Sequence, residues 1–565
     1  MRFNPYDKIT FFLTFLVLVF AGVMAFVQKK IQTPVRQVLF CIPLLVCVVH
    51  FFINRYKGCE YMTVVMYAGL YMSAAVIAIW GFSSKTVIMR NVSLGFCVFS
   101  VLYFLIVPAS LKPHTGNYSK CSYTESFEKI LYQMEKDYVL SSWKDVDYEK
   151  IKADLMPMFF EAESNNDGVL YCEALLRYIY ALNDGHIVLN CFNAKGREYL
   201  DKAVEKLAGN DFGFSMIKLS TGETIAILVD ENSEAYDAGI RFGTVIKKWN
   251  GVPVDEASEQ VECVYDSKTI HSFPVKANED MLKPVFLAGK SGEKLEVVFT
   301  DDNGKDTLAV LNVRGGYNSR LKKALKLFYH TQTNDFENLY TKKLNDKCGY
   351  MIVNSASMSS TNAMIAQMTG EYGMLVDRIT KKIEELGDIE EIILDLRNNC
   401  GGFDVFSMAL TSVFTDEEFF GYSDGKVKNG EFKVLDRHFI KGNGRFKNLR
   451  VGVLVNSECR SAGDSLTDFL SRLPNVTVYG ITGNNCIDQN PGGLCVSANG
   501  YFGIRYPIGP VLDENNNPRI DTKADRIATV DMDHRIALDY EAARVIFEEL
   551  GDYELNYVMK SECHH

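Results

Sequence analysis

The sequence lacks an excess of positive charge. Its 60 Lys and Arg residues are outnumbered by 71 Asp and Glu residues, which gives a formal net charge of −11 at pH 7. Because no basic stripe offsets this balance, the charge pattern argues against a nucleic-acid partner. The 14 cysteines are few for 565 residues, so a disulfide scaffold is excluded. Neither a C-x-x-C pair nor a His/Cys cluster is present to suggest a metal site.

Apolar residues are unevenly distributed, although the overall composition is ordinary for a globular protein. Four strongly apolar segments lie at residues 9–27, 37–54, 61–80 and 92–110. Each is roughly as long as a bilayer requires, so we predict four membrane helices. A cleaved signal peptide explains the first segment alone but not the three that follow. No ionisable residue lies deep in these segments, so an anchor is favoured over a transport path.

The region after these segments changes character twice. Residues 122–190 have the apolar spacing of helices, and the last of these is predicted to end at Asn183-Asp184-Gly185-His186, where glycine supplies the stop. From Asp211 to Val313 the pattern is one of short strands with glycine turns. Residues 347–550 then alternate strands and helices, as expected for an α/β domain. A mixed linker separates these last two regions.

Ser461 lies in the most informative part of the α/β region. The apolar run Val451–Val455 predicts a buried parallel strand, and Ser461-Ala462-Gly463-Asp464 opens an amphipathic helix. A serine at such a turn is held out beside free N–H groups at a helix N-terminus, which is what acyl transfer requires. The alternative is that Ser461 merely caps the helix.

Several motifs together resemble the S41 serine peptidases, the family of C-terminal processing proteases and the tricorn core. The resemblance covers roughly residues 122–550. A further part resembles a PDZ domain, with Asp211 to Phe214 as the loop that receives a peptide's terminal carboxylate. The S41-like motifs occur in the family's order: Asp184-Gly185-His186, the PDZ-like insert, Asp395-Leu396-Arg397-Asn398-Asn399-Cys400-Gly401-Gly402, and Ser461-Ala462-Gly463-Asp464.

The resemblance implies roles for individual residues. Ser461 is the implied nucleophile, and the oxyanion donors are the amide of Ala462 and an amide of the glycine pair, Gly402 rather than Gly401. The lysine base of the bacterial branch is missing, because no Lys occurs between Lys447 and Lys523. The tricorn-like branch instead implies His186 as the base. The implied acidic partner is Glu514 or Asp521, with Asp513 also in position, and the implied peptide-binding residues are Phe212, Gly213 and Phe214.

The predicted fold class is therefore multidomain α/β with a ClpP/crotonase-like peptidase core. The predicted parts are a four-helix transmembrane anchor at 1–115, a helical region at 116–200, a PDZ-like domain at 205–315, a linker at 316–346 and the peptidase core at 347–556. Counts of Lys and Arg flanking the apolar segments are nearly equal on the two sides, so sidedness stays open. The resemblance implies a peptidase domain outside the cytoplasm.

The predicted function is that of a membrane-anchored serine endopeptidase that acts on extended proteins or peptides, with the lipid bilayer as a partner and without a metal or organic cofactor. The alternative is a catalytically inactive peptide-binding membrane receptor. A Cys459 nucleophile is less favoured, because this residue precedes the helix turn. Cys486 and Cys495 form a candidate disulfide if the domain is extracytoplasmic.

Overall fold

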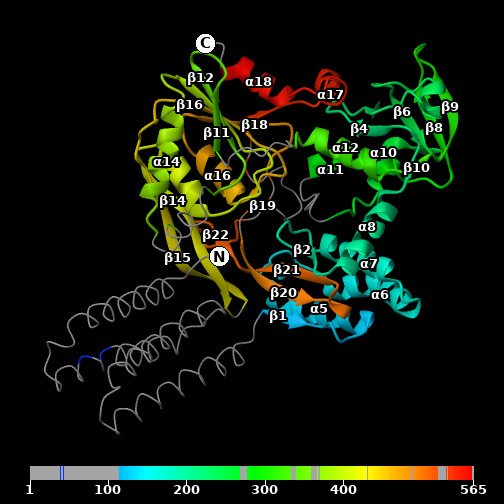
Figure 1. The fold of residues 1–565 in the computed structure, drawn as a ribbon, viewed down its shortest axis with the longest axis horizontal. Coiled ribbons are helices and arrows are strands. Elements are labelled where there is room, and N and C mark those ends of the chain that lie inside the picture. Colours follow the sequence, from blue (N-terminus) through cyan, green and yellow to red (C-terminus); the bar gives the residue numbers. More distant parts are fainter. Residues whose placement is uncertain are drawn as a thin grey trace, which may run out of the picture. The chain divides into compact units, whose positions relative to one another are not determined.

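The computed structural model divides the chain into two compact units, Met1–Thr115 and Gly116–His565 (Figure 1). The described residues are 114–266, 276–331, 339–357, 370–428, 430–484, 486–487, 489–519, 530 and 532–562, together with Leu39, Ile42 and Ala366. Apart from Leu39 and Ile42, the four apolar segments of the N-terminal region lie outside the described residues.

The predicted fold class is corrected in its membrane part. Within the described ranges, no helix combines the length and the apolar composition that a bilayer crossing requires. The longest described helix, α6 (Tyr148–Ser164), has 17 residues and buries one face, with Leu155, Phe159 and Ala162 pointing inward. What the structure supports is a multidomain α/β fold.

The helical region begins with helices whose buried faces follow the predicted spacing. Helix α5 (Tyr123–Asp137) starts at Ser122, whose hydroxyl caps the first turn, and buries Phe127, Ile130 and Met134. Helix α7 (Gly168–Ala181) is capped by Asp167 and is followed by β2 (Val188–Cys191) and α8 (Ala194–Ala208). The predicted helices in this region are confirmed.

A four-stranded sheet joins this helical region to a much later part of the chain. Its order is β1 (Thr115–Asn117), β20 (Asn490–Val496), β21 (Phe502–Gly509) and β2. Val188 in β2 pairs with Arg505 in β21, which in turn pairs with Leu494 in β20. The segment that follows His186 is therefore held against a hairpin that lies some 300 residues later in the sequence.

The β-rich insert between residues 209 and 317 builds its core around Trp249. The rings of Phe212 and Phe214 pack edge-on against this indole, and both phenylalanines are buried. The insert comprises a hairpin of β4 (Ser215–Lys218) and β5 (Thr224–Ile227), and a sheet ordered β7 (Val252–Pro253), β6 (Ile246–Trp249), β8 (Lys294–Thr300), β9 (Asp306–Asn312). Between these strands lie the helices α9 (Glu234–Asp237), α10 (Val254–Glu259) and α11 (Lys276–Leu287), and β3 (Asn210–Asp211) pairs with β10 (Gly315–Gly316).

The α/β core contains a six-stranded sheet in which the predicted apolar runs form the central strands. Its order is β11 (Leu339–Lys343), β12 (Cys348–Val353), β13 (Glu391–Asp395), β16 (Arg450–Leu454), β18 (Val476–Gly480), β23 (His534–Arg535). All pairs except β11–β12 are parallel. The central strands β12, β13 and β16 are buried on both faces, as parallel strands usually are, whereas both residues of the edge strand β23 are exposed. Helices α14 (Gly373–Glu384), α15 (Asp404–Ser412), α16 (Ala462–Ser471), α17 (Tyr540–Phe547) and α18 (Tyr553–Glu562) belong to this region (Figure 1).

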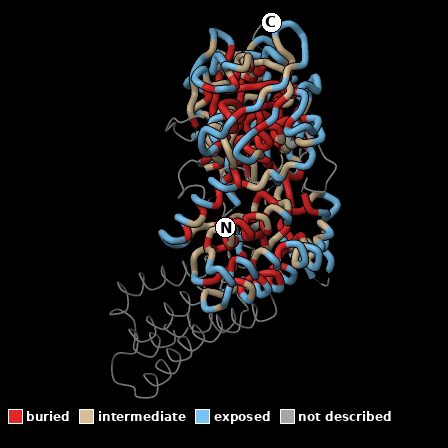
Figure 2. Tube along the Cα trace, turned by 90° about the vertical axis from the view of Figure 1, so that its right-hand side faces the viewer, coloured by how far each residue is buried: buried red, intermediate tan, exposed pale blue. Residues whose placement is uncertain are grey.

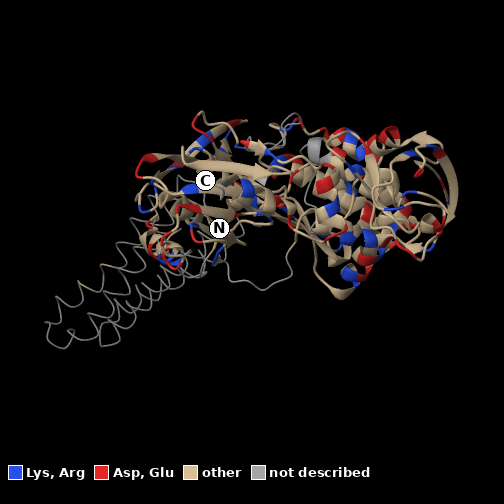
Figure 3. Ribbon diagram, turned by 90° about the horizontal axis from the view of Figure 1, so that it is seen from above, with Lys and Arg blue, Asp and Glu red and all other residues tan. Residues whose placement is uncertain are grey.

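Two core segments differ from the sequence prediction. The polar stretch 420–447 contains a long hairpin of β14 (Glu418–Lys428) and β15 (Glu431–Lys441), which pairs further with β22 (Val511–Leu512). Strand β15 alternates exposed and partly buried residues, so its short apolar face was not recognised. The predicted linker 316–346 contains the amphipathic helix α12 (Asn318–Phe328). Figure 2 shows the buried residues in the interior of the described elements, and Figure 3 shows basic and acidic residues interspersed over them.

Candidate functional site

Ser461 occupies a strained turn between a short strand and a helix. It is the second residue of β17 (Arg460–Ser461), and helix α16 begins at the next residue. Its backbone has φ 56° and ψ −131°, a conformation that residues other than glycine rarely adopt. Its side chain makes no capping hydrogen bond to α16, which disfavours the helix-cap alternative. Backbone strain of this kind is typical of a nucleophile presented at a strand-to-helix turn.

The glycine pair of the preceding core loop lies directly against this turn. A Cβ atom at Gly401 would lie 2.5 Å from Cβ of Ser461 and 2.9 Å from the amide nitrogen of Ala462. A Cβ atom at Gly402 would lie 2.6 Å from the carbonyl oxygen of Ala356. Both glycines have positive φ, of 88° and 152°. Only glycine fits at this close approach, because a side chain would strike the backbone or the serine.

The hydrogen bonds of this loop distinguish the two glycine amides. The N–H of Gly401 donates to Oδ1 of Asn399 at 2.9 Å, so it is already occupied. Within the described ranges the fold provides no acceptor for the N–H of Gly402. Ala462 is the first residue of α16, so its N–H has no intrahelical acceptor. Among the described residues, the amides of Gly402 and Ala462 are thus left without an acceptor.

Asn399 fixes these two loops to each other. It is fully buried, and its side chain donates to the carbonyl oxygen of Val353 at the end of β12 (2.8 Å). Its own carbonyl oxygen accepts the N–H of Arg460, next to the serine, at 3.0 Å. A Cβ atom at Gly463 would lie 2.7 Å from that same carbonyl oxygen, so glycine is needed there as well. We did not predict a role for Asn399, although it lies within the motif that carried the resemblance.

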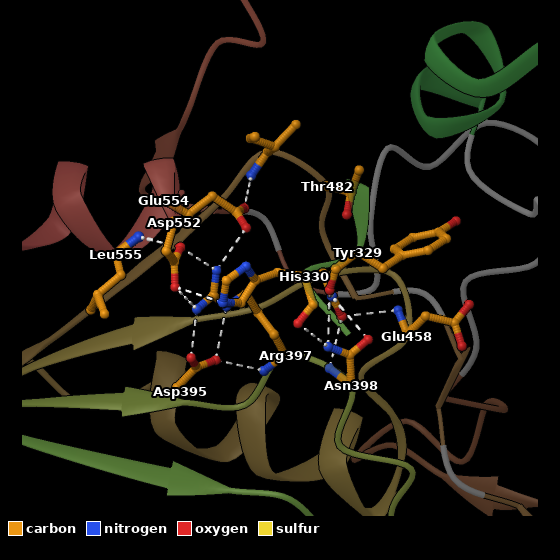
Figure 4. A network of polar contacts seen from close by, with 12 residues as sticks. Tyr329, His330, Asp395, Arg397, Asn398, Glu458, Thr482, Asp552, Glu554 and Leu555 are labelled. Carbon is orange, nitrogen blue, oxygen red and sulfur yellow. Dashed lines mark hydrogen bonds and ion pairs between the residues drawn. The ribbon is translucent and has the colours of Figure 1, made fainter. Parts of the chain in front are cut away.

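Arg397, in the same loop, is held by three carboxylates (Figure 4). Its guanidinium is buried and pairs with Asp395 at 2.6 Å, Asp552 at 2.8 Å and Glu554 at 3.1 Å. The carboxylate of Asp552 also lies 3.0 Å from the ring of His330. Burial alone would lower the pKa of Arg397, but Asp395 and Asp552 raise it well above its usual value, so the guanidinium stays charged. The start of α18 is thereby tied to the loop that carries the glycine pair.

The carbonyl oxygen of Tyr329 connects the loop to the turn that precedes the serine. It accepts from the side chain of Asn398 at 2.9 Å and from the side chain of Asn456 at 3.0 Å (Figure 4). Asn398 has a positive φ of 61°, which asparagine tolerates better than most residues. Tyr329 caps helix α12, so the helix that leaves the β-rich insert ends between the two loops of the site.

Glu458 lies three residues before Ser461 in the same turn. Its carboxylate is largely buried, at 14% side-chain exposure, and lies 3.8 Å from the guanidinium of Arg460. Burial raises the pKa of Glu458 to about 8. We did not predict this perturbed carboxyl from the sequence, because no spacing rule distinguishes it from an ordinary surface glutamate.

His186 stands at the end of the helical region, directly before β2. Its backbone N–H donates to Oδ1 of Asp184 at 2.8 Å, and its Nδ1 lies 3.8 Å from the same oxygen. The side chain is 13% exposed. Strand β2, which follows it, pairs with β21, and the β20–β21 hairpin continues from β19 (Cys486–Ile487), whose Ile487 pairs with Ser461. One late segment therefore contacts both the nucleophile turn and the strand that follows the histidine.

None of the three acidic residues predicted as partners of His186 has a described contact with it. Glu514 is exposed in the turn after β22, where its charge acts on Arg472. Asp521 lies outside the described residues. Asp513 accepts the backbone N–H groups of Asn515 and Asn517 in the same turn. A carboxylate that was not predicted, that of Asp184, contacts His186.

Cys459 and Cys495, and the phenylalanines of the candidate peptide-binding loop, are buried. Cys459 is a buried free thiol. Cys495 is also free and buried, so the structure does not pair it with Cys486. The side chains of Phe212 and Phe214 are 1% and 0% exposed. They belong to the core of the insert, so any contact of this loop with a peptide would use its backbone.

The sequence was also compared with protein families and with known proteins. Residues 347–530 match the family described as Peptidase family S41. This match covers the core and not residues 205–315, so the PDZ-like assignment gains no support from it. No curated protein matches the sequence.

Three solved structures align with this chain at low sequence identity and with TM-scores below 0.5. Mature CPAF is 12% identical with a TM-score of 0.45, and the alignment covers 78% of this chain and 96% of CPAF. A putative peptidase from Parabacteroides merdae is 15% identical with a TM-score of 0.38, covering 76% and 96%. The photosystem II D1 C-terminal processing protease is 14% identical with a TM-score of 0.31, covering 77% and 99%.

Proposed function

We propose that the protein is an endopeptidase that acts on extended protein or peptide substrates through a Ser461–His186 acyl-enzyme mechanism. The match of residues 347–530 to peptidase family S41 supports a serine-type peptidase. The observation that carries this proposal is the strained backbone of Ser461, held against Gly401 at the N-terminus of α16. An exposed hydroxyl beside preorganised N–H donors is the arrangement that acyl transfer uses.

The proposed reaction proceeds in two halves. His186 removes the proton from Oγ of Ser461 as the oxygen attacks the substrate carbonyl carbon. The amides of Gly402 and Ala462 donate to the resulting oxyanion. The C–N bond then breaks, and the imidazolium gives its proton to the leaving amine. Water attacks the acyl-enzyme with the same histidine as base and releases the carboxylic acid and the free serine.

The choice of His186 as base is supported by two observations. The chain has no lysine between Lys447 and Lys523, so the loop beside Ser461 offers no ammonium that could serve as a base. The strand after His186 is hydrogen-bonded to the hairpin that continues from the partner strand of Ser461. A neutral imidazole is a competent base for a serine hydroxyl near physiological pH.

The proposal is tested by turnover of an unfolded protein such as β-casein by the full-length chain. Ser461→Ala and His186→Ala should each lower cleavage by at least ~10³-fold while the far-UV circular dichroism is unchanged. The matched control is Ser471→Ala, at the end of the same helix, which should cleave like the wild type. Wild-type activity in Ser461→Ala would overturn the nucleophile, and wild-type activity in His186→Ala would overturn the base.

A further inference from the structure

Asp184 contacts both the backbone and the imidazole ring of His186. Its Oδ1 accepts the backbone N–H of His186 at 2.8 Å and lies 3.8 Å from Nδ1 of the ring. The Asp-Gly-His sequence produces this geometry locally, because an aspartate side chain readily accepts from the N–H two residues later. The carboxylate thus contacts the histidine from the side of the ring that carries Nδ1.

The other carboxylate oxygen of Asp184 is held by two residues from the end of α5 and the loop after it. Tyr138 donates to Oδ2 at 2.5 Å, and the ammonium of Lys144 lies 3.6 Å from the same atom. Lys144 also donates to the carbonyl oxygen of Asn183. The Lys144 and Asp184 side chains are only 4% and 3% exposed, so this arrangement is enclosed by the fold.

These contacts keep the carboxylate charged. Burial alone would raise the pKa of Asp184, but Lys144, His186 and Tyr138 together lower it well below the usual value. A buried carboxylate that is fixed by two donors cannot turn away to solvent. It therefore offers a permanent negative charge beside a ring that must become positive when it accepts the serine proton.

We propose that Asp184, held by Tyr138 and Lys144, is a positioning residue of His186. This inference rests on the proposed role of His186 as the base. Asp184 fixes the backbone of the histidine through its N–H and places charge near Nδ1, so that Nε2 is left to accept the proton of Ser461. Glu514, in contrast, is exposed in the turn after β22, where its charge acts on Arg472.

The test is Asp184→Asn in the full-length protein, because asparagine keeps an oxygen for the His186 N–H while the charge and the acceptor of the Tyr138 O–H are lost. The expected result is a fall in kcat of about 10²-fold with little change in KM. The acid limb of the kcat/KM profile should move to lower pH by about one unit, because the imidazole loses a neighbouring anion. The titratable groups that face the carboxylate are Tyr138, Lys144 and His186.

The matched control is Asp154→Asn, an exposed aspartate on α6 of the same region, which should leave kcat and the pH profile unchanged. Asp184→Asn leaves Lys144 buried without its partner, so the double variant Asp184→Asn/Lys144→Met is measured as well. The double variant removes both charges and should show the same loss of kcat in a folded protein.

A folded Asp184→Asn, or a folded double variant, with wild-type kcat and an unchanged pH profile would overturn the inference. His186→Ala separates this result from failure of the proposed function. If His186→Ala is inactive while Asp184→Asn is fully active, the base is retained and Asp184 is only structural. If His186→Ala is fully active, the proposed base itself fails, and the role of Asp184 with it.

Discussion

Arg397 and Asp552 form a two-point ion pair in which both nitrogen–oxygen distances are 2.8 Å. The pair joins the loop that carries Gly401 and Gly402 to the segment before α18, 155 residues further along the chain. Because paired N–H groups meet paired oxygens, the geometry fixes orientation as well as distance. The C-terminal end of the described chain is therefore part of the scaffold of the site.

Replacing Arg397 tests this scaffold. Arg397→Met leaves the carboxylates of Asp395, Asp552 and Glu554 buried without their cation, which typically costs about 3–5 kcal/mol of folding stability. We expect a clear fall in the thermal unfolding midpoint, measured by calorimetry. Arg397→Lys should also be destabilised, because an ammonium cannot make the two-point pair. The matched control is Arg445→Met, whose partner Glu384 is at the surface; equal midpoints for these variants would contradict the account.

Ser461→Gly should separate strain from chemistry. At φ 56° and ψ −131° a non-glycine residue costs of order 1–3 kcal/mol, and glycine removes this cost. We expect Ser461→Gly to raise the unfolding midpoint relative to Ser461→Ala, which keeps the strain. Both variants lack the hydroxyl and should be inactive. If the glycine variant were no more stable than the alanine variant, the turn would not be strained in solution.

Asn399 offers a prediction on the oxyanion donors. Asn399→Ala removes the acceptor of the Gly401 N–H and the donor to Val353, so the loop beside Ser461 loses its alignment. We expect kcat to fall by about 10²-fold with a smaller change in KM, since oxyanion contacts act in the transition state. Asn303→Ala, in an exposed turn of the insert, is the control. A rise in KM with an unchanged kcat would show that Asn399 serves substrate binding instead.

Glu458 predicts a dependence of stability on pH. Its carboxyl has a pKa of about 8 when folded, raised by burial from the ordinary 4.5. The folded state therefore binds the proton of Glu458 more tightly than the unfolded state does. The stability that this protonation contributes is fully present below pH 4.5 and is lost as the pH rises to about 8. Glu458→Gln should reduce the fall of the unfolding midpoint between these pH values. Parallel curves for wild type and Glu458→Gln would contradict the assignment.

The sequence predicted the parts of the fold that have strong local signals. Buried runs such as Val451–Val455 form central strands, and the helical spacing of Phe127, Ile130 and Met134 is confirmed. The hairpin β14–β15 was not predicted, because the inward face of β15 is mostly only partly buried and carries Asp436. Helix α12 was missed, although Leu321, Ala324, Leu325 and Phe328 have the spacing of a buried helical face. The pairing of β2 with β21 depends on residues some 300 positions apart, which no local pattern encodes.

The sequence motifs indicated the residues of the candidate site, but not the residues that hold them in position. Ser461 and the glycine pair lie together, and the occupied amide of Gly401 agrees with the preference for Gly402 as donor. Tertiary contacts determine the roles of Asn399, Asp552 and Asp184, so residue type and spacing could not rank them. Asp184 belongs to the Asp184-Gly185-His186 motif, and its contact with His186 could have been expected from the Asp-Gly-His spacing alone.

The most direct test of the central claim is covalent labelling of the full-length protein with a fluorophosphonate, followed by tandem mass spectrometry. The account predicts a single phosphonate adduct on Ser461 in the wild type, and none on this residue in His186→Ala over the same time. A folded wild-type protein in which Ser461 stays unmodified would contradict the account and would favour a peptide-binding receptor without catalysis.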